Sequence, residues 1–532
     1  MQKKKEYFYS KIGEENVLRL EKGKRGLLNV LFGRSMMCAF LLLIQFLLMF
    51  SLIAWLGAKA TYGYALGMLV GFIVVIHVVN REGNMGMKIT WILLMTILPV
   101  FGIGLYVWIQ LNLGHRLMHQ ELQKTIEETK EYVSNDSQLL EKIEEEDVNL
   151  HRLVRYLDDH GNFPVYDDTA SRYLASGEEY FEVLLEELEK AEKFIFMEYF
   201  IVQEGYMWGR VLDILKRKVD QGVEVKIIYD GGCAVSRLPY SYPEKLKKLG
   251  IQCKMFAPPK PVMSTHYNNR DHRKIVVIDG KTGFCGGVNL SDEYINRKTL
   301  YGHWKDTGLV IYGDAVRSMT LMFLQIWNMT EKDRKYKDYI YSSPVVKNPG
   351  HGYVIPYADS PLDNERVGEM VYMDIINKAN YYVHITTPYL IIENEMLSAL
   401  CFAAKRGVDV KLILPHIPDK EYAFALAKTH YKELIKAGVK IYEYLPGFIH
   451  AKSFVSDDKH AVVGSINLDY RSLYLSFENA VYLYKTASVR DIEKDFQSTL
   501  AKCMRATEET MKKEKLSRKV LGLILKVFAP LM

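Results

Sequence analysis

Hydrophobic positions are distributed unevenly along the chain. Three runs without Asp, Glu, Lys or Arg lie near its start, at residues 36–56, 60–80 and 89–114. Each reaches the ~20 residues with which an α-helix spans the apolar core of a bilayer. The pattern therefore predicts a transmembrane region over residues 36–114, with helices at about 36–56, 60–80 and 89–110.

The charges that flank these runs bear on orientation. Residues 1–35 form a basic tail with nine Lys and Arg, whereas the gap before the second run has only Lys59. The positive-inside rule then places the N-terminus in the cytoplasm and, after three crossings, the rest of the chain outside. The cysteines beyond residue 114 are odd in number, scattered and without a CxxC pair, which is typical of reduced thiols and favours the opposite face. If the first run lies in the interface without spanning, the large domain moves to the cytoplasm.

Beyond residue 114 the pattern changes. Residues 115–147 are charged, free of glycine and rich in helix-favouring residues, which predicts a helical linker at 115–150. From residue 151 on, apolar β-rich runs such as KFIFMEYFIV alternate with amphipathic stretches. This alternation predicts an α/β fold.

The α/β part contains an internal repeat. AEKFIFMEYFIVQEG, QGVEVKIIYDG, HRKIVVIDG and FCGGVNLSDEY are followed, in the same order, by ANYYVHITTPYLIIE, RGVDVKLILPH, HAKSFVSDD and AVVGSINLDYR. Two copies about 180 residues apart are too few and too long for a solenoid. We expect a duplicated domain whose halves face each other across a pseudo-twofold axis. The expected units are a first half at 151–330, a connector at 331–365, a second half at 366–500 and a basic amphipathic tail at 501–532.

Each copy carries an H-x-K-x4-D motif. On a β-strand, positions i and i+2 share a face, so the histidine and lysine project together. The aspartate begins a turn, and after Asp279 the chain is expected to return as a hairpin strand. The motif residues are His272, Lys274 and Asp279 in the first copy and His450, Lys452 and Asp457 in the second.

Two such motifs in register fit phosphoryl-transfer chemistry. A neutral imidazole can attack phosphorus while a second, protonated imidazole donates a proton to the leaving alkoxide. The lysines supply charge for the phosphate oxygens, and Asn289 and Asn467, each 17 residues after its histidine, supply amides where charge develops. No metal or other cofactor is required. We assign His272 as nucleophile and His450 as general acid and then base; the near-symmetry of the repeat leaves the reverse assignment as the alternative.

A nucleophilic histidine usually has its second ring nitrogen held by a carboxylate, which fixes the tautomer. Glu478 is the candidate partner of His450, and Asp306 is the candidate partner of His272. The alternative is that each carboxylate is an ordinary acid at the end of a strand.

The paired motifs resemble those of the phospholipase D superfamily, and essentially the whole chain resembles the bacterial cardiolipin synthases of that superfamily. The resemblance extends to KITWILLMTILPVFGIGLYV, GFCGGVNLSDEY, GFIHAK, VGSINLDYRS and SFENAVYLY. It implies a phospholipase D-type α/β/α sandwich of two halves with one active site between them. Together with the predicted transmembrane region, it leads us to expect a multi-pass protein of the bacterial cell membrane. It also implies a covalent phosphatidyl-histidine and transfer of a phosphatidyl group between two phosphatidylglycerol molecules, with release of glycerol. All six motif residues are matched, and we expect the two aspartates to orient the motif. The chain departs from the family in having a third apolar run where two are common.

The net charge of the chain limits the classes of partner that it can bind. Lys and Arg number 69 against 64 Asp and Glu, a net charge of +5 that is too balanced for a general nucleic-acid binder. Much of the basic excess flanks the apolar runs or lies in residues 512–532, which have the spacing of an amphipathic helix. That helix either lies on an anionic membrane or docks on the domain itself. The expected partners are therefore phosphatidylglycerol and anionic membrane lipid.

Three functions fit these observations. The first is a cardiolipin-forming phosphatidyltransferase. The second is a membrane-bound hydrolase of the phospholipase D type, which would share both motifs but pass the intermediate to water. The third is a non-catalytic membrane scaffold, which the intact motifs oppose because a scaffold needs neither lysine.

Overall fold

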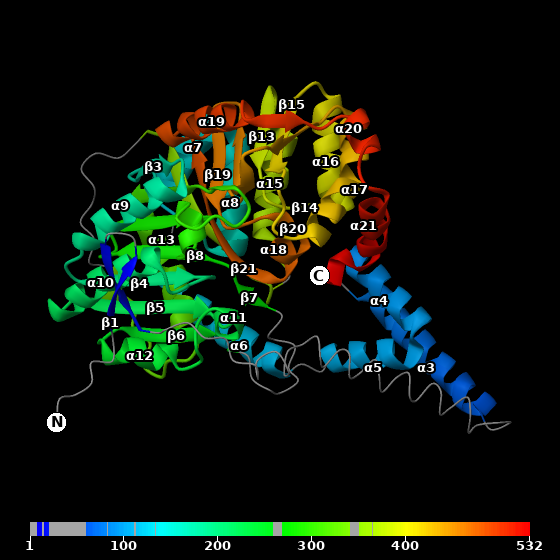
Figure 1. Ribbon diagram of the computed structural model, residues 1–532, viewed down its shortest axis with the longest axis horizontal. Helices are drawn as coiled ribbons and strands as arrows, with labels where there is room; N and C mark the ends of the chain where they lie inside the picture. The colour runs from blue at the N-terminus through cyan, green and yellow to red at the C-terminus, as the bar shows by residue number, and fades with distance from the viewer. Residues whose placement is uncertain are drawn as a thin grey trace.

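The computed structural model describes residues 8–12, 15–20, 60–81, 83–110, 113–133, 135–258, 269–340, 351–363 and 365–531. Two mixed β-sheets with covering helices dominate the architecture (Figure 1). The first sheet has the strand order β3-β11-β9-β8-β4-β5-β6. Its strands are β3 (Ala170–Leu174), β4 (Phe194–Tyr199), β5 (Glu224–Asp230), β6 (Gln252–Phe256), β8 (Lys274–Ile278), β9 (Thr282–Gly286) and β11 (Gly308–Tyr312).

The second sheet repeats this order as β12-β21-β19-β18-β13-β15-β16, followed by β22. In both sheets three parallel strands are joined antiparallel to the strand that follows the motif histidine. The duplicated α/β fold predicted from the repeat is therefore confirmed. The strands are β12 (Tyr353–Asp359), β13 (Tyr382–Thr386), β15 (Asp409–Pro415), β16 (Lys440–Tyr444), β18 (Ser453–Ser456), β19 (His460–Gly464), β21 (Ser476–Tyr484) and β22 (Cys503–Arg505).

The two sheets pack face to face. A shared apolar core lies between them, built from alternate residues of the central strands and from α13 (Val316–Asn328), and it includes Phe196, Val277, Val463 and Val481. Each outer sheet face is covered by helices. On the first half these are α9 (Gly177–Glu189), α10 (Tyr206–Asp220) and α12 (Tyr242–Lys248), and on the second α15 (Val367–Lys378), α16 (Asn394–Lys405) and α17 (Glu421–Ala437).

The predicted hairpin after Asp279 is present in both halves. β8 and β9 pair antiparallel around a turn in which Asp279 and Gly280 have positive φ, and β18 and β19 do the same around Asp457 and Asp458. Aspartate and glycine tolerate the left-handed conformation that such turns require. The register of these hairpins sets the position of every motif side chain.

The structure corrects the prediction of a transmembrane region. Residues 60–80 form α3 (Ala60–Asn80), but the third run is divided at Leu98 into α4 (Met85–Ile97) and α5 (Pro99–Gln110). Proline removes a backbone donor and interrupts the helix here. Among the described residues, none of the helices combines the length and the apolar character needed to cross a membrane. The multi-pass prediction is therefore wrong for 60–80 and 89–110, while 36–56 lies outside the described residues.

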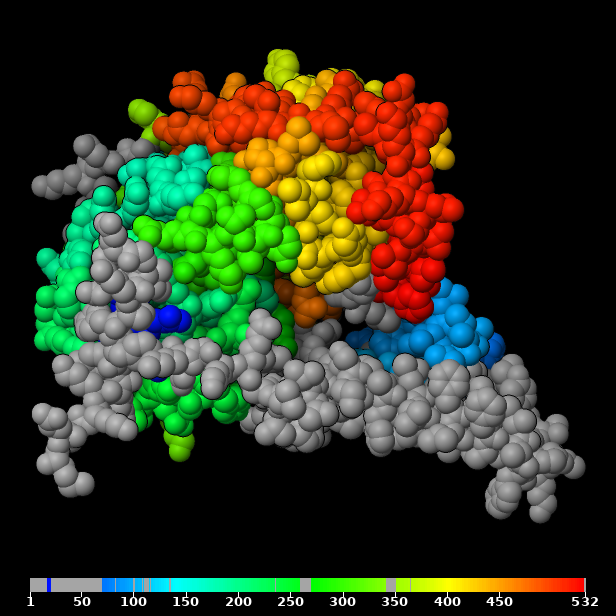
Figure 2. All heavy atoms as spheres, in the orientation of Figure 1, coloured from blue at the N-terminus to red at the C-terminus, as the bar shows by residue number. Residues whose placement is uncertain are grey.

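The segments on either side of the sheets also pack on them. The expected linker at 115–150 contains α6 (Leu113–Thr129), η1 (Lys130–Tyr132), α7 (Ser137–Glu146) and the start of α8 (Val148–Gly161). Ile143 and Leu150 join the core of the second half. At the other end, α20 (Glu508–Lys512) leads to α21 (Leu516–Phe528), which lies along α17, and to η4 (Ala529–Leu531). In Figure 2 this red segment reaches the light-blue α4.

The N-terminal hairpin is docked on the first half. It consists of β1 (Phe8–Ile12) and β2 (Glu15–Arg19), and Val17 and Leu18 are fully buried against α10. Gly209 permits this contact, because a Cβ there would lie 2.8 Å from the Val17 Cβ. Part of the expected basic tail is thus an element of the folded body.

Candidate active site

Each motif histidine lies next to a short strand that pairs with a strand of the opposite half. β7 (Arg270–Asp271) pairs in parallel with β21 of the second half, and the His272 amide donates to the Phe477 carbonyl at 2.9 Å. Reciprocally, β17 (Gly447–Ile449) pairs in parallel with β10 (His303–Lys305) of the first half, and the His450 amide donates to the Lys305 carbonyl at 2.7 Å. This exchange of short strands brings the two motifs to the interface between the halves.

Each histidine is held by a carboxylate of the opposite half. His272 Nδ1 lies 2.9 Å from Glu478 Oε2, and His450 Nδ1 lies 2.7 Å from Asp306 Oδ2. The pairing predicted from the sequence, within each half, is wrong because it did not anticipate the strand exchange. Holding Nδ1 leaves Nε2 as the nitrogen that can react.

The motif lysines are buried beside their histidines. Lys274 and Lys452 each donate to the main-chain carbonyl of the histidine two residues before. Burial lowers the pKa of Lys274 to about 8, and burial lowers the pKa of Lys452 to about 7. The carboxylates Glu478 and Asp306 counteract part of this effect. Two amino groups, each positive when protonated, thus stand next to the histidines and are largely excluded from solvent.

Both imidazoles favour the neutral form in this environment. Burial, followed by the charges of the two lysines, holds the pKa of His272 well below its usual value. Burial and then Lys452 lower the pKa of His450 to about 4, although Asp306 opposes this shift. A neutral imidazole has the lone pair that a nucleophile requires.

The two carboxylates differ in acidity. Burial raises the pKa of Glu478 to about 7, despite the nearby lysine charges and a hydrogen bond from Ser465. Burial also acts on Asp306, but His450 and Lys452 outweigh it and hold the pKa of Asp306 below its ordinary value. At neutral pH Asp306 is therefore a fixed negative charge, whereas Glu478 is partly protonated.

Small residues leave room for these carboxylates. A Cβ on Gly287 would lie 2.1 Å from Asp306 Oδ1, so glycine is required where the carboxylate passes. In the second half the matching residue is Ser465, whose hydroxyl donates to Glu478.

The motif aspartates lie at the far ends of their strands. Asp279 accepts hydrogen bonds from the amides of Glu192, Lys193 and Phe194, at 2.7 to 2.8 Å. Asp457 accepts from the matching amides of Asn380, Tyr381 and Tyr382, at 2.7 to 2.9 Å. In both halves the aspartate therefore ties the hairpin turn to the start of the neighbouring strand and is remote from the histidines.

The two predicted asparagines are both buried but differ in their contacts. Asn289 accepts from the Ile201 amide at 2.9 Å and donates to the Tyr294 hydroxyl at 2.8 Å, so it braces the first half. Asn467 Oδ1 is buried and accepts no hydrogen bond from the described part of the chain.

Several side chains of the site had no signal in the motif. Asn479, next to Glu478, accepts from the Lys274 amide at 3.0 Å and so locks the first motif to the second sheet. The rings of Tyr294, Trp304 and Phe448 surround His450, with centroids 5.4 to 5.8 Å away, whereas Phe200 contacts His272 at 4.9 Å. Asn479 could have been found in the sequence, because it directly follows Glu478, the acid that matches Asp306 in the other copy. The aromatic rings around His450 could not, because only the folded chain brings them together.

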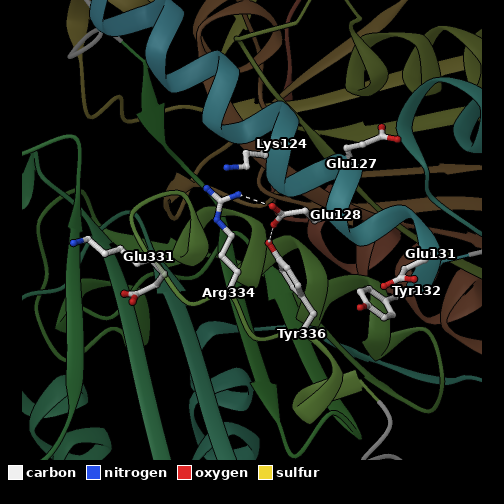
Figure 3. Close-up of a pocket in the computed structure, with 9 residues that line it drawn as sticks. Lys124, Glu127, Glu128, Glu131, Tyr132, Glu331, Arg334 and Tyr336 are labelled. Atoms are coloured by element: carbon white, nitrogen blue, oxygen red, sulfur yellow. Dashed lines mark hydrogen bonds and ion pairs between the residues drawn. The ribbon is translucent and has the colours of Figure 1, made fainter.

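A separate polar depression of about 720 Å³ lies between α6 and the segment that follows α13 (Figure 3). Arg334 bridges Glu121 and Glu128 at 2.5 and 2.9 Å, and Tyr336 donates to Glu128 at 3.1 Å. These contacts brace α6 against the body. The depression contains none of the motif residues.

Comparison with known proteins agrees with this arrangement. The family model described as "Cardiolipin synthase, PLD-like domain" matches residues 184–327 and 372–500. An uncharacterized protein of Streptococcus mutans is 49% identical over 86% of this chain and 99% of its own length. Cardiolipin synthase 2 of Bacillus anthracis is 34% identical over 86% of this chain and 89% of its own length.

The fold is shared more widely. The crystal structure of phosphatidylserine synthase from Haemophilus influenzae superposes with a TM-score of 0.54 at 18% identity, and covers 71% of this chain and 97% of that protein. At this identity the likeness concerns the fold alone. Together, the matched family model, the curated relatives and the duplicated sheet show that the chain belongs to the cardiolipin synthase family of phospholipase D-like proteins.

Proposed function

We propose that the protein is a phosphatidyltransferase that makes cardiolipin, by joining two phosphatidylglycerol molecules and releasing one glycerol. The observation that carries this proposal is the pair of motif histidines, His450 buried and His272 partly buried, each held by a carboxylate of the other half and flanked by a buried lysine. Family membership supports the same reaction class.

In the first step, His272 Nε2 attacks the phosphorus of the donor lipid. The bond between phosphorus and Nε2 forms as the bond to the headgroup glycerol oxygen breaks, and protonated His450 gives its proton to that oxygen. An anionic phosphodiester raises the pKa of His450, because it offsets the charges of Lys274 and Lys452. The same lysines stabilise the negative charge on the phosphoryl oxygens in the transition state.

In the second step, His450 takes a proton from the hydroxyl of the acceptor phosphatidylglycerol. The alkoxide oxygen bonds to phosphorus, the bond to Nε2 breaks and His272 returns to its neutral form. Atoms and charge balance over the two steps, because one glycerol leaves for each cardiolipin formed.

The assignment of His272 as nucleophile is supported by access and charge. The His272 side chain is 14% exposed, whereas His450 is 9% exposed and enclosed by aromatic rings. Asp306, which is fully charged, stabilises a protonated His450 better than the partly protonated Glu478 stabilises a protonated His272. His450 is therefore suited to carry protons, and His272 to remain neutral and attack.

Labelled phosphatidylglycerol tests this assignment in two single variants. His450→Ala is expected to retain label on the protein, because the intermediate forms slowly and is not discharged, whereas His272→Ala is expected to retain none. Label on His450 in the His272→Ala variant would contradict the assignment. With the wild type, cardiolipin plus glycerol supports transfer, and phosphatidic acid plus glycerol would instead indicate a hydrolase.

The protein also presents a surface suited to a membrane. α21 docks on α17 through buried Gly522 and an ion pair between Arg518 and Glu421 at 3.0 Å, and Thr90 of α4 donates to the Val527 carbonyl at 2.8 Å. The outer faces of α3, α4 and α21 expose apolar side chains. These are Leu69, Phe72, Ile73, Ile76 and Val79, then Met85, Ile89, Leu93 and Ile97, then Leu516, Val520, Leu523, Ile524 and Val527.

This apolar surface, with Lys519 and Lys526 on α21 and Lys515 at its N-cap, is suited to rest on an anionic bilayer. Co-sedimentation with phosphatidylglycerol vesicles tests it. The double variant Leu523→Asp, Ile524→Asp is expected to bind less well, and Tyr240→Asp, which changes an exposed ring on the first half, is the matched control. Equal binding of the two variants would contradict membrane docking through α21.

A further inference from the structure

The proposed reaction requires two phosphates in the site at once. The donor phosphate reacts at the histidines, and Lys274 and Lys452 stand beside it. The acceptor lipid brings a second phosphodiester, one glycerol away from its attacking hydroxyl. This second anion does not react, yet it must be held while the hydroxyl meets the phosphorus.

Three further cations converge near His272 from three different elements. Arg270 lies in β7, two residues before the histidine. Arg471 lies in α18 (Tyr470–Tyr474), just before the strand β21 on which β7 pairs. Lys420 precedes α17, and its amino group lies 5.2 Å from the centroid of the Tyr389 ring.

The backbone links these cations in a defined way. Tyr389 comes directly before β14 (Leu390–Ile391), which pairs in parallel with β20 (Leu468–Asp469), and α18 follows β20 without a break. Lys420 and Arg471 therefore project from neighbouring elements of the second half. The charges of both contribute to the low pKa of His272.

The carboxylates near these cations also accept hydrogen bonds from other donors. Asp230 is fully buried, accepts from the amides of Gly232 and Asp271 at 2.7 and 3.0 Å, and forms an ion pair with Arg270 at 3.4 Å. Asp469 caps α18 through the Ser472 amide at 2.8 Å, and Asp419 accepts from the Tyr389 hydroxyl at 2.7 Å. Asp230 and Asp469, the acids beside the arginines, therefore divide their charge between several donors.

We propose that Arg270, Lys420 and Arg471 form a second anion site, which binds the unreacted phosphodiester of the acceptor phosphatidylglycerol. This inference rests on the proposed function, since it names how that reaction selects its acceptor. Guanidinium groups match phosphate geometry, and a lysine adds a point charge. The site favours an acceptor that carries a phosphate over free glycerol or water.

Two assays on the full chain separate acceptor recognition from donor chemistry. One measures cardiolipin formation from phosphatidylglycerol. The other measures exchange of the headgroup of phosphatidylglycerol for labelled free glycerol, which uses the same donor and histidines but an acceptor without phosphate.

Lys420→Gln and Arg471→Gln are each expected to lower the ratio of cardiolipin formation to glycerol exchange about tenfold, the order expected for one charge-assisted hydrogen bond. Lys436→Gln, at the other end of α17, and Arg490→Gln, on α19 (Ala487–Leu500), are matched controls whose ratio stays at the wild-type value. Lys420 is exposed, so its variant keeps the test informative if Arg471→Gln does not fold.

An equal loss of both activities, or an unchanged ratio, would overturn the second anion site and leave the proposed function intact. A wild-type protein that exchanges glycerol but makes no cardiolipin would overturn the proposed function and this inference together.

Discussion

The two halves of the molecule place the same motif in different surroundings. Behind the first motif, Arg273 lies 2.6 Å from Glu198 and 3.5 Å from Asp271, and all three side chains are buried. The second motif has Ala451 at the position of Arg273, and Thr386 stands where Glu198 would be. Duplication has thus kept the strand order and the reacting groups, whereas the residues that support them have diverged.

The difference continues at the carboxylates. Glu478 receives a hydroxyl from Ser465, whereas Asp306 passes a glycine and keeps a lower pKa. A site with two equivalent histidines could begin the reaction from either side. Unequal partners give each histidine one role, and substitutions in the two halves should therefore have unequal effects.

The largest expected effect concerns the carboxylates. Asp306→Asn is expected to lower kcat for cardiolipin formation by roughly 10³-fold, because an amide neither fixes the reactive tautomer nor stabilises protonated His450. The fold-decrease in kcat caused by Glu478→Gln is expected to be at least ten times smaller, since Glu478 is already partly neutral near pH 7. Steady-state kinetics on mixed micelles measures both, and equal losses would show that the two carboxylates are equivalent.

The lysines come next. Lys274→Met and Lys452→Met are each expected to lower kcat/KM by roughly 10²-fold, the order found when one group that stabilises transition-state charge is removed. Because only the protonated amine is positive, kcat/KM of the wild type is expected to fall as the pH rises through about 7 to 8. A pH profile that is flat to pH 9 would contradict a role for these charges in the free enzyme.

The buried ion cluster of the first half gives an effect on stability. Arg273→Met leaves Glu198 and Asp271 buried beside an apolar side chain, and is expected to lower the free energy of unfolding by about 3 kcal/mol. The double variant Arg273→Met, Glu198→Met is expected to recover part of that loss, because it removes one unpaired acid along with the arginine. Urea denaturation measures both. If the double variant is less stable than Arg273→Met, the cluster stabilises the fold in some other way.

The sequence predicted the duplicated α/β fold because the repeat preserves strand-forming runs, turn residues and motif spacing together. It also identified residues that the structure brings to one place, such as His272 and His450, since their spacing is local. The carboxylate partner predicted for each histidine was the one that binds the other histidine. The sequence could not show this, because β7 and β17, which pair with the opposite half, are only two and three residues long and too short to have a recognisable hydrophobic periodicity.

The front of the chain shows a different limit of sequence reasoning. Hydrophobic runs report how apolar a segment is, but Pro99 and the break at Leu98 divide the third run into two helices. The amphipathic spacing of 512–532 was compatible with docking on the domain and with an outward apolar face, and α21 has both features. Tertiary contacts with α17, which no local pattern encodes, decide which side is buried.

The smallest expected effect concerns the motif aspartates, where the two halves are most alike. Asp279 and Asp457 each accept three backbone amides, but Asp279 is buried while Asp457 is partly exposed. Asp279→Asn is expected to lower the free energy of unfolding by about 2 kcal/mol and Asp457→Asn by about 1 kcal/mol, because water can replace lost hydrogen bonds at the exposed site. Thermal or urea unfolding gives these values, and kcat of the folded fraction should stay within about twofold of the wild type because neither carboxylate touches the histidines. A large loss of kcat at wild-type stability would instead show that these aspartates take part in the reaction. The different burial of Asp279 and Asp457 would then not determine how the two halves respond to these substitutions.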